Sequence, residues 1–306
     1  MRSGFALALL LLAGTASAQP AEELRLLSEH AVEGMRGGNL SGLAQCGGDL
    51  LTISDRDDDR LYRLDTRDST WQAEAVPIDV PPVPDSGLPW GLKTRTWATS
   101  VVRGGELDYE GISCDRAGNR YIVSEAHAAV LQVAPTGSAQ WLKISPSLVR
   151  EARASGMLLH FNALFEGLAV NPEGNQLWLA AERERRGLLR IKRQQTVWDC
   201  EGSCVLLSEA GTQMQPAQFP NARAVSRDFA DLAWFAGKLF PLERNAYEIC
   251  RRAPNPQAYG LAEALVIDAE GAWVGIDNNN GARADGEVRP VVWRFAAPVG
   301  GWSDKS

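Results

Sequence analysis

The chain has 306 residues and a formal net charge of −7, with hydrophobic residues at 45% and charged residues at 23%. These proportions are those of a globular protein, and they exclude the disordered, collagen-like and coiled-coil classes. The acidic balance also argues against sequence-independent binding of nucleic acid, which needs a basic face.

Residues 1–18 have the pattern of a removable secretory leader. Arg2 precedes an apolar run over residues 5–13, and Ala16-Ser17-Ala18 forms a small-residue cleavage site. No other apolar stretch approaches the roughly 20 residues that a membrane span requires. We therefore expect one domain over residues 19–306, with no membrane span, located in the periplasm or outside the cell.

Five later segments repeat one outline. Each opens with a small or acidic residue, a small residue and a large aliphatic residue, and a β-rich run then leads to a carboxylate 13 to 16 residues from the start. The openings are Ser41-Gly42-Leu43, Glu110-Gly111-Ile112, Glu166-Gly167-Leu168, Ala230-Asp231-Leu232 and Glu263-Ala264-Leu265. The carboxylates are Asp55, Glu125, Glu182, Glu243 and Asp277. A fixed outline recurring along the chain predicts a repeat architecture.

A further β-rich run follows the carboxylate in most repeats, at residues 60–64, 130–133, 187–191 and 291–295. Three antiparallel strands per repeat describe the blade of a β-propeller. We expect an all-β fold with a single propeller, in which five blades are favoured and six are not excluded. Residues 24–32 are expected to add an outer strand that closes the last blade.

Two insertions interrupt the repeats. Residues 70–105 are rich in proline, which lacks the donor that a central strand needs, and predict a loop across one face. Ser145 and Pro146 before residues 147–154, with Gly156 after them, predict a short helix.

Cysteine pairing is expected in an oxidising compartment. Cys200 and Cys204 bracket a loop of three residues that is short and flexible enough to close as a disulfide. A zinc site is the alternative, but no second cysteine pair and no nearby histidine supports it. The pairing of Cys46, Cys114 and Cys250 stays open.

The first residue of each repeat should lie near the propeller axis, because the first strand of every blade lines the central channel. This first ring reads Ser41, Glu110, Glu166, Ala230 and Glu263. Carboxylates that converge without partners repel one another, and a hard cation such as Ca²⁺ relieves the repulsion. The sequence therefore predicts an axial calcium held by Ser41, Glu110, Glu166 and Glu263. The alternative is that these glutamates face water or pair with arginines.

The carboxylates that end the β-rich runs form a second ring. The second strand of a hairpin returns to the end where the first began, so both rings should lie near the same opening. Glu125, Glu182 and Glu243 are candidates for a general base. Candidates for substrate binding are Arg56, Arg183, Arg244, Asp277 and Asn278, and the arginines among them suit a phosphate or carboxylate group. The alternative is that these groups form structural ion pairs between blades.

The run Asp55-Arg56-Asp57-Asp58-Asp59 resembles the start of an EF-hand loop. Arg60 stands where that loop needs glycine, and Thr66 stands where it needs a bidentate glutamate. A solvated hairpin is the preferred interpretation.

Four segments carry a resemblance to a known family: residues 107–112, 165–169, 227–232 and 263–279. They resemble the bacterial phytase-like family that is labelled for the esterase-like activity of phytase. The resemblance extends over about residues 40–295. It implies an exported β-propeller that hydrolyses esters or phosphoesters.

A second resemblance is more distant. Residues 40–56 are similar to the first blade of the calcium-activated nucleotidases, which are five-bladed propellers with an axial Ca²⁺ held by serine and glutamate. The match implies ligand positions at Ser41, Glu110, Glu166 and Glu263, whereas Ala230 departs from a serine. It favours five blades over six.

Two classes of function remain. The first is a monomeric calcium-dependent hydrolase of a small anionic or ester substrate, in which the cation activates water or a substrate oxygen. The second is a non-catalytic propeller, stabilised by calcium, that binds a ligand or an envelope protein. The sequence does not decide whether the protein is an enzyme.

Overall fold

A computed structural model describes residues 23–85, 87–95, 105–215, 221–245, 261–277 and 285–302. The expected leader, Cys250 and Asn278 lie outside these residues.

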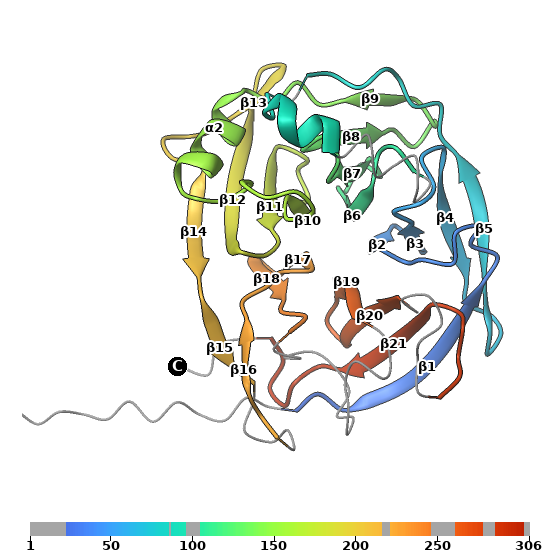
Figure 1. Ribbon diagram of the computed structural model, residues 1–306. Coiled ribbons are helices and arrows are strands. Elements are labelled where there is room, and N and C mark those ends of the chain that lie inside the picture. Colours follow the sequence, from blue (N-terminus) through green and yellow to red (C-terminus); the bar gives the residue numbers. More distant parts are fainter. Residues whose placement is uncertain are drawn as a thin grey trace, which may run out of the picture.

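The described chain is mostly β-structure and forms a propeller-type fold, with small sheets arranged around a centre (Figure 1). The first sheet contains β2 (Gly42–Cys46), β3 (Asp49–Ile53), β4 (Arg60–Asp65) and β5 (Trp71–Pro77). The second contains β6 (Tyr109–Cys114), β7 (Arg120–Ser124), β8 (Ala129–Val133) and β9 (Ala139–Trp141). The third contains β10 (Phe165–Val170), β11 (Gln176–Ala181), β12 (Arg185–Gln194), β13 (Val197–Asp199) and β14 (Val205–Ala210).

The fourth sheet is a hairpin in the described residues, made of β17 (Asp231–Phe235) and β18 (Lys238–Leu242). The fifth contains β19 (Leu261–Ile267), β20 (Gly271–Asp277), β21 (Val291–Ala296) and β1 (Leu26–Glu33). A small outer hairpin joins β15 (Thr212–Met214) to β16 (Ala224–Ser226). Each of the five predicted repeats therefore begins at the inner strand of one sheet.

The inner strands lie side by side around the centre in the order β2, β6, β10, β17 and β19, and β19 packs against β2 (Figure 1). Small residues permit this approach. A Cβ atom at Gly111 would lie 2.8 Å from the carbonyl oxygen of Glu166, and one at Gly167 would lie 2.7 Å from the Cα of Asp231. The small second position of the repeat is thus explained by backbone contact between neighbouring inner strands.

β1 closes the ring, as the sequence predicted. It pairs antiparallel with β21, where Leu26 faces Phe295. It also pairs parallel with β5, where Val32 faces Trp71, so that the last and first sheets form one eight-stranded sheet. The N-terminal strand therefore links the two ends of the propeller.

The insertions agree only in part with expectation. The helix α2 (Ser147–Ala154) has the predicted bounds, and Gly156 follows it with a φ of 86°. The prediction of a loop from residue 70 is wrong at its start, because residues 71–77 form β5. This strand ends at Pro77, which has no backbone N–H to donate.

Two disulfides are present in the described residues. Cys200 pairs with Cys204 as predicted, and Cys46 pairs with Cys114, which joins the ends of β2 and β6. Disulfides indicate an oxidising compartment outside the cytoplasm. No helix in the described ranges is long and apolar enough to cross a membrane.

Candidate functional site

The glutamates of the first ring lie at irregularities in the inner strands. Tyr109 and Gly111 pair with consecutive residues of β7, so that Glu110 is an extra residue between them. The same shift in register occurs at Glu166 in β10 and at Glu263 in β19. A β-bulge re-aims the side chain of the extra residue, and here each bulge directs a carboxylate toward the propeller centre.

The carboxylates of the second ring lie at the ends of the second strands. Asp55, Glu125 and Glu182 follow β3, β7 and β11, and Asp277 is the last residue of β20. Four members of each ring line one cavity of about 410 Å³. Its lining includes Ser41, Asp55, Arg56, Glu110, Glu125, Glu166, Glu182, Arg183, Arg244, Glu263 and Asp277. The structure thus brings four members of each predicted ring together at one opening.

Three carboxylates form the buried part of this cavity. Glu125, Glu166 and Glu182 each place an oxygen within 4.8 Å of the other two, and they are 3%, 6% and 1% exposed. The Oε2 atom of Glu182 is buried and has no hydrogen-bond partner in the described residues. This cluster could hold a metal ion, because a cation would satisfy the convergent charges and the orphaned oxygen.

A second group contains Asp55, Asp108 and Glu110, whose oxygens also lie within 4.8 Å of one another. Asp108 has a φ of 53°, in the left-handed region that non-glycine residues seldom adopt. The two groups are electrostatically linked, because the charge of Glu166 acts on Glu110.

Burial changes the acidity of these groups. Desolvation and the neighbouring Glu166 raise the pKa of Glu110 and of Glu125 well above the usual range. Desolvation raises the pKa of Glu182 to about 8, although Arg244 acts in the opposite direction. Without a cation, burial therefore favours the protonated form of these carboxyl groups.

Arg244 is the main internal counter-charge. Its Nη2 atom lies 2.6 Å from Oε1 of Glu182, and its Nη1 atom lies 2.5 Å from Oε2 of Glu263. Its Nε donates to Oδ2 of Asp228 at 3.0 Å. The alternative that first-ring glutamates pair with arginines is therefore correct for Glu263. Arg244 contacts three carboxylates before any substrate binds.

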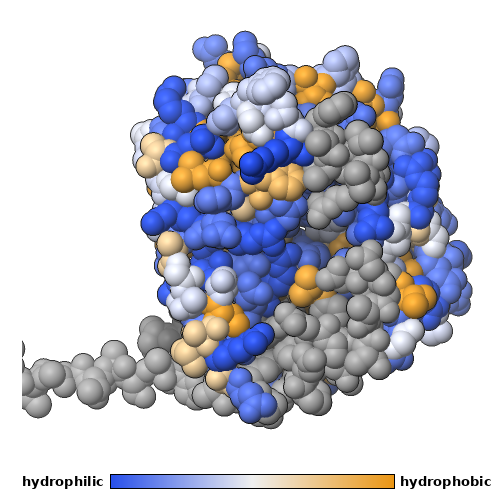
Figure 2. Space-filling model, in the orientation of Figure 1, coloured by the Kyte–Doolittle hydropathy of each residue, from blue (hydrophilic) through white to orange (hydrophobic). Residues whose placement is uncertain are grey.

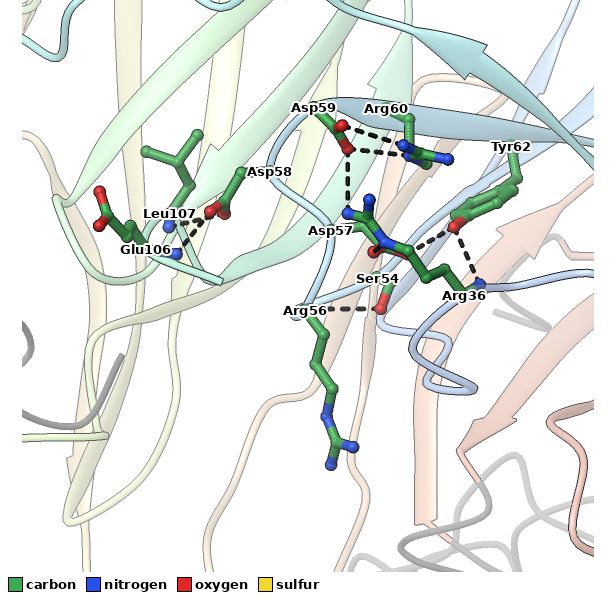
Figure 3. A network of polar contacts seen from close by, with 10 residues as sticks. All are labelled: Arg36, Ser54, Arg56, Asp57, Asp58, Asp59, Arg60, Tyr62, Glu106 and Leu107. Atoms are coloured by element: carbon green, nitrogen blue, oxygen red, sulfur yellow. Dashed lines mark hydrogen bonds and ion pairs between the residues drawn. The ribbon is translucent and has the colours of Figure 1, made fainter. Parts of the chain in front are cut away.

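The other two predicted arginines, Arg56 and Arg183, also line the cavity. Arg183 is 39% exposed at its side chain, lies 2.9 Å from Oε1 of Glu182 and donates to the carbonyl oxygen of Asn162. Figure 3 shows the side chain of Arg56 extending away from the neighbouring polar network.

The fourth sheet does not place its acid in the cavity. Glu243 pairs with Arg186 at 3.0 Å and accepts a hydrogen bond from Gln213. Arg186 is itself stacked over the ring of Phe229. Ala230 is fully buried in the inner strand region.

The acidic run after β3 has a structural role (Figure 3). Asp57 is 1% exposed, and its Oδ1 lies 2.7 Å from Nε of Arg36. Its Oδ2 accepts a hydrogen bond from the Tyr62 hydroxyl at 2.5 Å. Asp58 accepts hydrogen bonds from the backbone N–H groups of Glu106 and Leu107 at 2.6 and 2.8 Å. The hairpin is thus no EF-hand, as expected, but the expectation of full solvation is wrong for Asp57.

Two residues of the site were missed by the sequence analysis, namely Asp108 and Asp228. Both stand two positions before a first-ring residue and are followed by an aromatic residue, as Asp108-Tyr109 and Asp228-Phe229. An aspartate followed by an aromatic residue was therefore the sequence signal that could have identified them.

Figure 2 shows that hydrophilic residues gather around the middle of the face drawn.

Residues 36–281 match the phytase-like family described as "esterase-like activity of phytase". The chain belongs to this phytase-like family. No curated protein matches its sequence. The predicted family resemblance is confirmed, and the phytase-like assignment covers both rings of the cavity.

Similar solved structures include two of virginiamycin B lyase from Staphylococcus aureus. The selenomethionine form has a TM-score of 0.40 at 7% identity, over 90% of this chain and 100% of that chain. The catalytically inactive form with quinupristin has a TM-score of 0.36 at 9% identity, over 84% and 66%. The Malassezia sympodialis allergen Mala s 1 has a TM-score of 0.40 at 12% identity, over 87% and 80%. None of these likenesses informs the activity of the phytase-like chain.

Proposed function

We propose that this protein is an exported, five-bladed, calcium-dependent hydrolase of phosphoester or carboxylic ester substrates. The observation that carries the proposal is the buried cluster of Glu125, Glu166 and Glu182, with the orphaned Oε2 of Glu182, at the base of a cavity that arginines also line. Ca²⁺ suits this set because it takes several carboxylate oxygens in flexible geometry. Periplasmic or extracellular location follows from the expected leader and agrees with the disulfides.

The ligand set proposed here differs from the ring of Ser41, Glu110, Glu166 and Glu263. Glu263 already pairs with Arg244, so its charge is compensated within the protein. The Oγ atom of Ser41 accepts a hydrogen bond from the backbone N–H of Asp55. Glu125 and Glu182 therefore replace them as the carboxylates that would hold the cation beside Glu166.

Bound at this cluster, the cation would supply Lewis acidity toward an ester or phosphoryl oxygen. Arg56 and Arg183 line the cavity and would bind the anionic group of the substrate. Glu110 is the carboxylate we assign to proton transfer, because it lies beside the cluster, where burial and the charge of Glu166 raise its pKa. Asp55 and Asp108 would keep its side chain in place through their shared group.

Two measurements test the proposal. The first is melting of the purified chain with calcium and with a chelator, where saturation at 100 times the dissociation constant adds about 2.7 kcal/mol of stability. Glu166→Gln should abolish most of the shift. Glu173→Gln is the matched control, since that side chain is 56% exposed and does not belong to the cluster.

The second measurement is turnover on phosphomonoesters, nucleotides, phytate, lactones and short acyl esters, each with calcium and with chelator. Calcium-dependent hydrolysis in one class identifies the substrate. A calcium-dependent melting shift without turnover in any class would support the non-catalytic propeller that binds a ligand or envelope protein instead. Melting that does not respond to calcium, with no metal found by analysis, would contradict the metal site.

A further inference from the structure

The fourth sheet differs from the others in the charge that it contributes to the cavity. Its first-ring position is Ala230, and its second-ring carboxylate, Glu243, pairs outside the cavity with Arg186. The next residue, Arg244, lines the cavity instead. In the described part of the chain, this sheet thus supplies a guanidinium where the other four supply a carboxylate.

The surroundings of Arg244 resemble those of a bound cation. Its three nitrogen atoms contact Glu182 at 2.6 Å, Asp228 at 3.0 Å and Glu263 at 2.5 Å. The exposed fractions of the side chains lie between 1% and 14%. The three carboxylates come from the end of β11, the segment before β17 and the bulge of β19. Buried carboxylates that converge from separate strands require a positive charge, which proteins commonly supply as a divalent ion.

We infer that Arg244 takes the place of a second divalent cation and limits the cavity to one calcium ion. This inference rests on the proposed function, because it places the one ion at Glu125, Glu166 and Glu182. Glu182 belongs both to the metal cluster and to the carboxylates around Arg244. Its Oε1 accepts a hydrogen bond from Arg244, and its Oε2 remains for the ion. A tethered guanidinium stays in place whatever the calcium concentration, so this half of the cavity always contains one positive charge.

The inference makes a prediction about stoichiometry that a purely structural ion pair does not make. Arg244→Gln removes the guanidinium from Asp228 and Glu263 and leaves Glu182 paired with Arg183 alone, and these groups then bind a second calcium next to the first. Arg244→Lys keeps a positive charge at the same position and binds one calcium. A structural role alone would lower stability in both variants and would leave the stoichiometry unchanged.

The experiment measures bound calcium per chain by titration calorimetry and by metal analysis after gel filtration, with folding checked by circular dichroism. We expect one ion in the parent and in Arg244→Lys, and two in Arg244→Gln. A folded Arg244→Gln with one ion, or a parent with two, overturns the inference. A parent with no calcium contradicts the proposed function itself, which is a separate result.

A second variant decides the matter even where Arg244→Gln fails to fold. Glu263→Gln keeps Arg244 and removes the charge of one of the three carboxylates that contact this arginine. We expect this variant to bind one calcium with less than a threefold change in affinity, because Glu263 belongs to the arginine. A loss of affinity of more than tenfold would place Glu263 on the metal and would overturn the inference.

Discussion

Oε1 of Glu182 lies 2.6 Å from Nη2 of Arg244, while Oε2 of the same carboxylate is buried with no hydrogen-bond partner in the described residues. One carboxylate oxygen of Glu182 therefore has an ion-pair partner, and the other oxygen has none in the described residues. This carboxylate thus links the ion pair with Arg244 to the cluster that could hold a metal ion.

Without calcium, stability should fall as the pH rises. The folded-state pKa of Glu182 is about 8, so between about pH 4.5 and 8 the unfolded chain loses a proton that the folded chain keeps. The folded state then binds more protons, and the free energy of unfolding decreases with pH. Urea titrations in chelator at pH 5 and pH 8 measure this difference.

The matched variant for this pH effect is Glu182→Gln, which should flatten the dependence. Saturating calcium should reverse it, because metal binding requires deprotonated carboxylates. Metal-free protein that is more stable at pH 8 than at pH 5 would contradict the burial argument.

Arg56→Ala and Arg183→Ala should weaken catalysis on a phosphorylated substrate. A hydrogen bond to a charged group contributes about 1.5 to 3 kcal/mol, so kcat/KM should fall by roughly 10- to 100-fold. Arg116→Ala is the control, because its side chain is 77% exposed and lies 3.8 Å from Glu173. Kinetics and melting are measured on the same proteins; lowered stability with unchanged kcat/KM would remove both arginines from the substrate site.

Asp58→Ala should weaken calcium binding although Asp58 is not proposed as a ligand. Its carboxylate holds the backbone of Glu106 and Leu107, which lead directly to Asp108 and Glu110 (Figure 3). Loss of these two hydrogen bonds should lower stability by about 1 to 3 kcal/mol and shift the calcium midpoint upward.

The control for this loop is Asp59→Ala. Asp59 is 56% exposed and pairs with Arg36 and Arg60, so about 1 kcal/mol or less should be lost and the calcium midpoint should not move. Equal calcium midpoints for the two variants would show that the loop does not position the site.

Gly167→Ala should destabilise the protein by about 1 to 3 kcal/mol. The added Cβ would lie 2.7 Å from the backbone of Asp231, which cannot move without shifting β17. Gly48→Ala is the control, because nothing lies within 4 Å of a Cβ at that position. Similar denaturation midpoints for the two variants would show that the inner strands have room to separate.

The sequence was sufficient to predict the first two strands of each sheet, because the repeat marks each inner strand with a small residue and ends the next strand with a carboxylate. It also predicted that most of these groups share one opening, which follows from hairpin geometry. It could not predict the direction of Glu243 and Arg244. In Asp55-Arg56 and Glu182-Arg183 both residues line the cavity, whereas in the fourth sheet Glu243 pairs with Arg186 and Arg244 alone lines it. That difference depends on a partner that is distant in the sequence.

The Cys46–Cys114 disulfide was likewise out of reach of the sequence. Its partners are 68 residues apart, and only the packing of β2 against β6 brings their Cα atoms to 5.6 Å. The β-bulges at Glu110, Glu166 and Glu263 could have been suspected from the glycine or alanine that follows each glutamate. Their presence depends on the pairing register, which the sequence alone leaves open.

The pairing of β1 with β21 has a consequence for the order of folding. Leu26 and Phe295 are paired although they lie near opposite ends of the sequence. The ring therefore closes only after the last sheet has been synthesised. Contacts of such long sequence separation form slowly, because the loop entropy is lost before the contacts are gained. Until closure, β21 and β5 each present an open edge to other strands. A chain that ends before residue 291 therefore leaves its first strand without the antiparallel neighbour that completes the propeller.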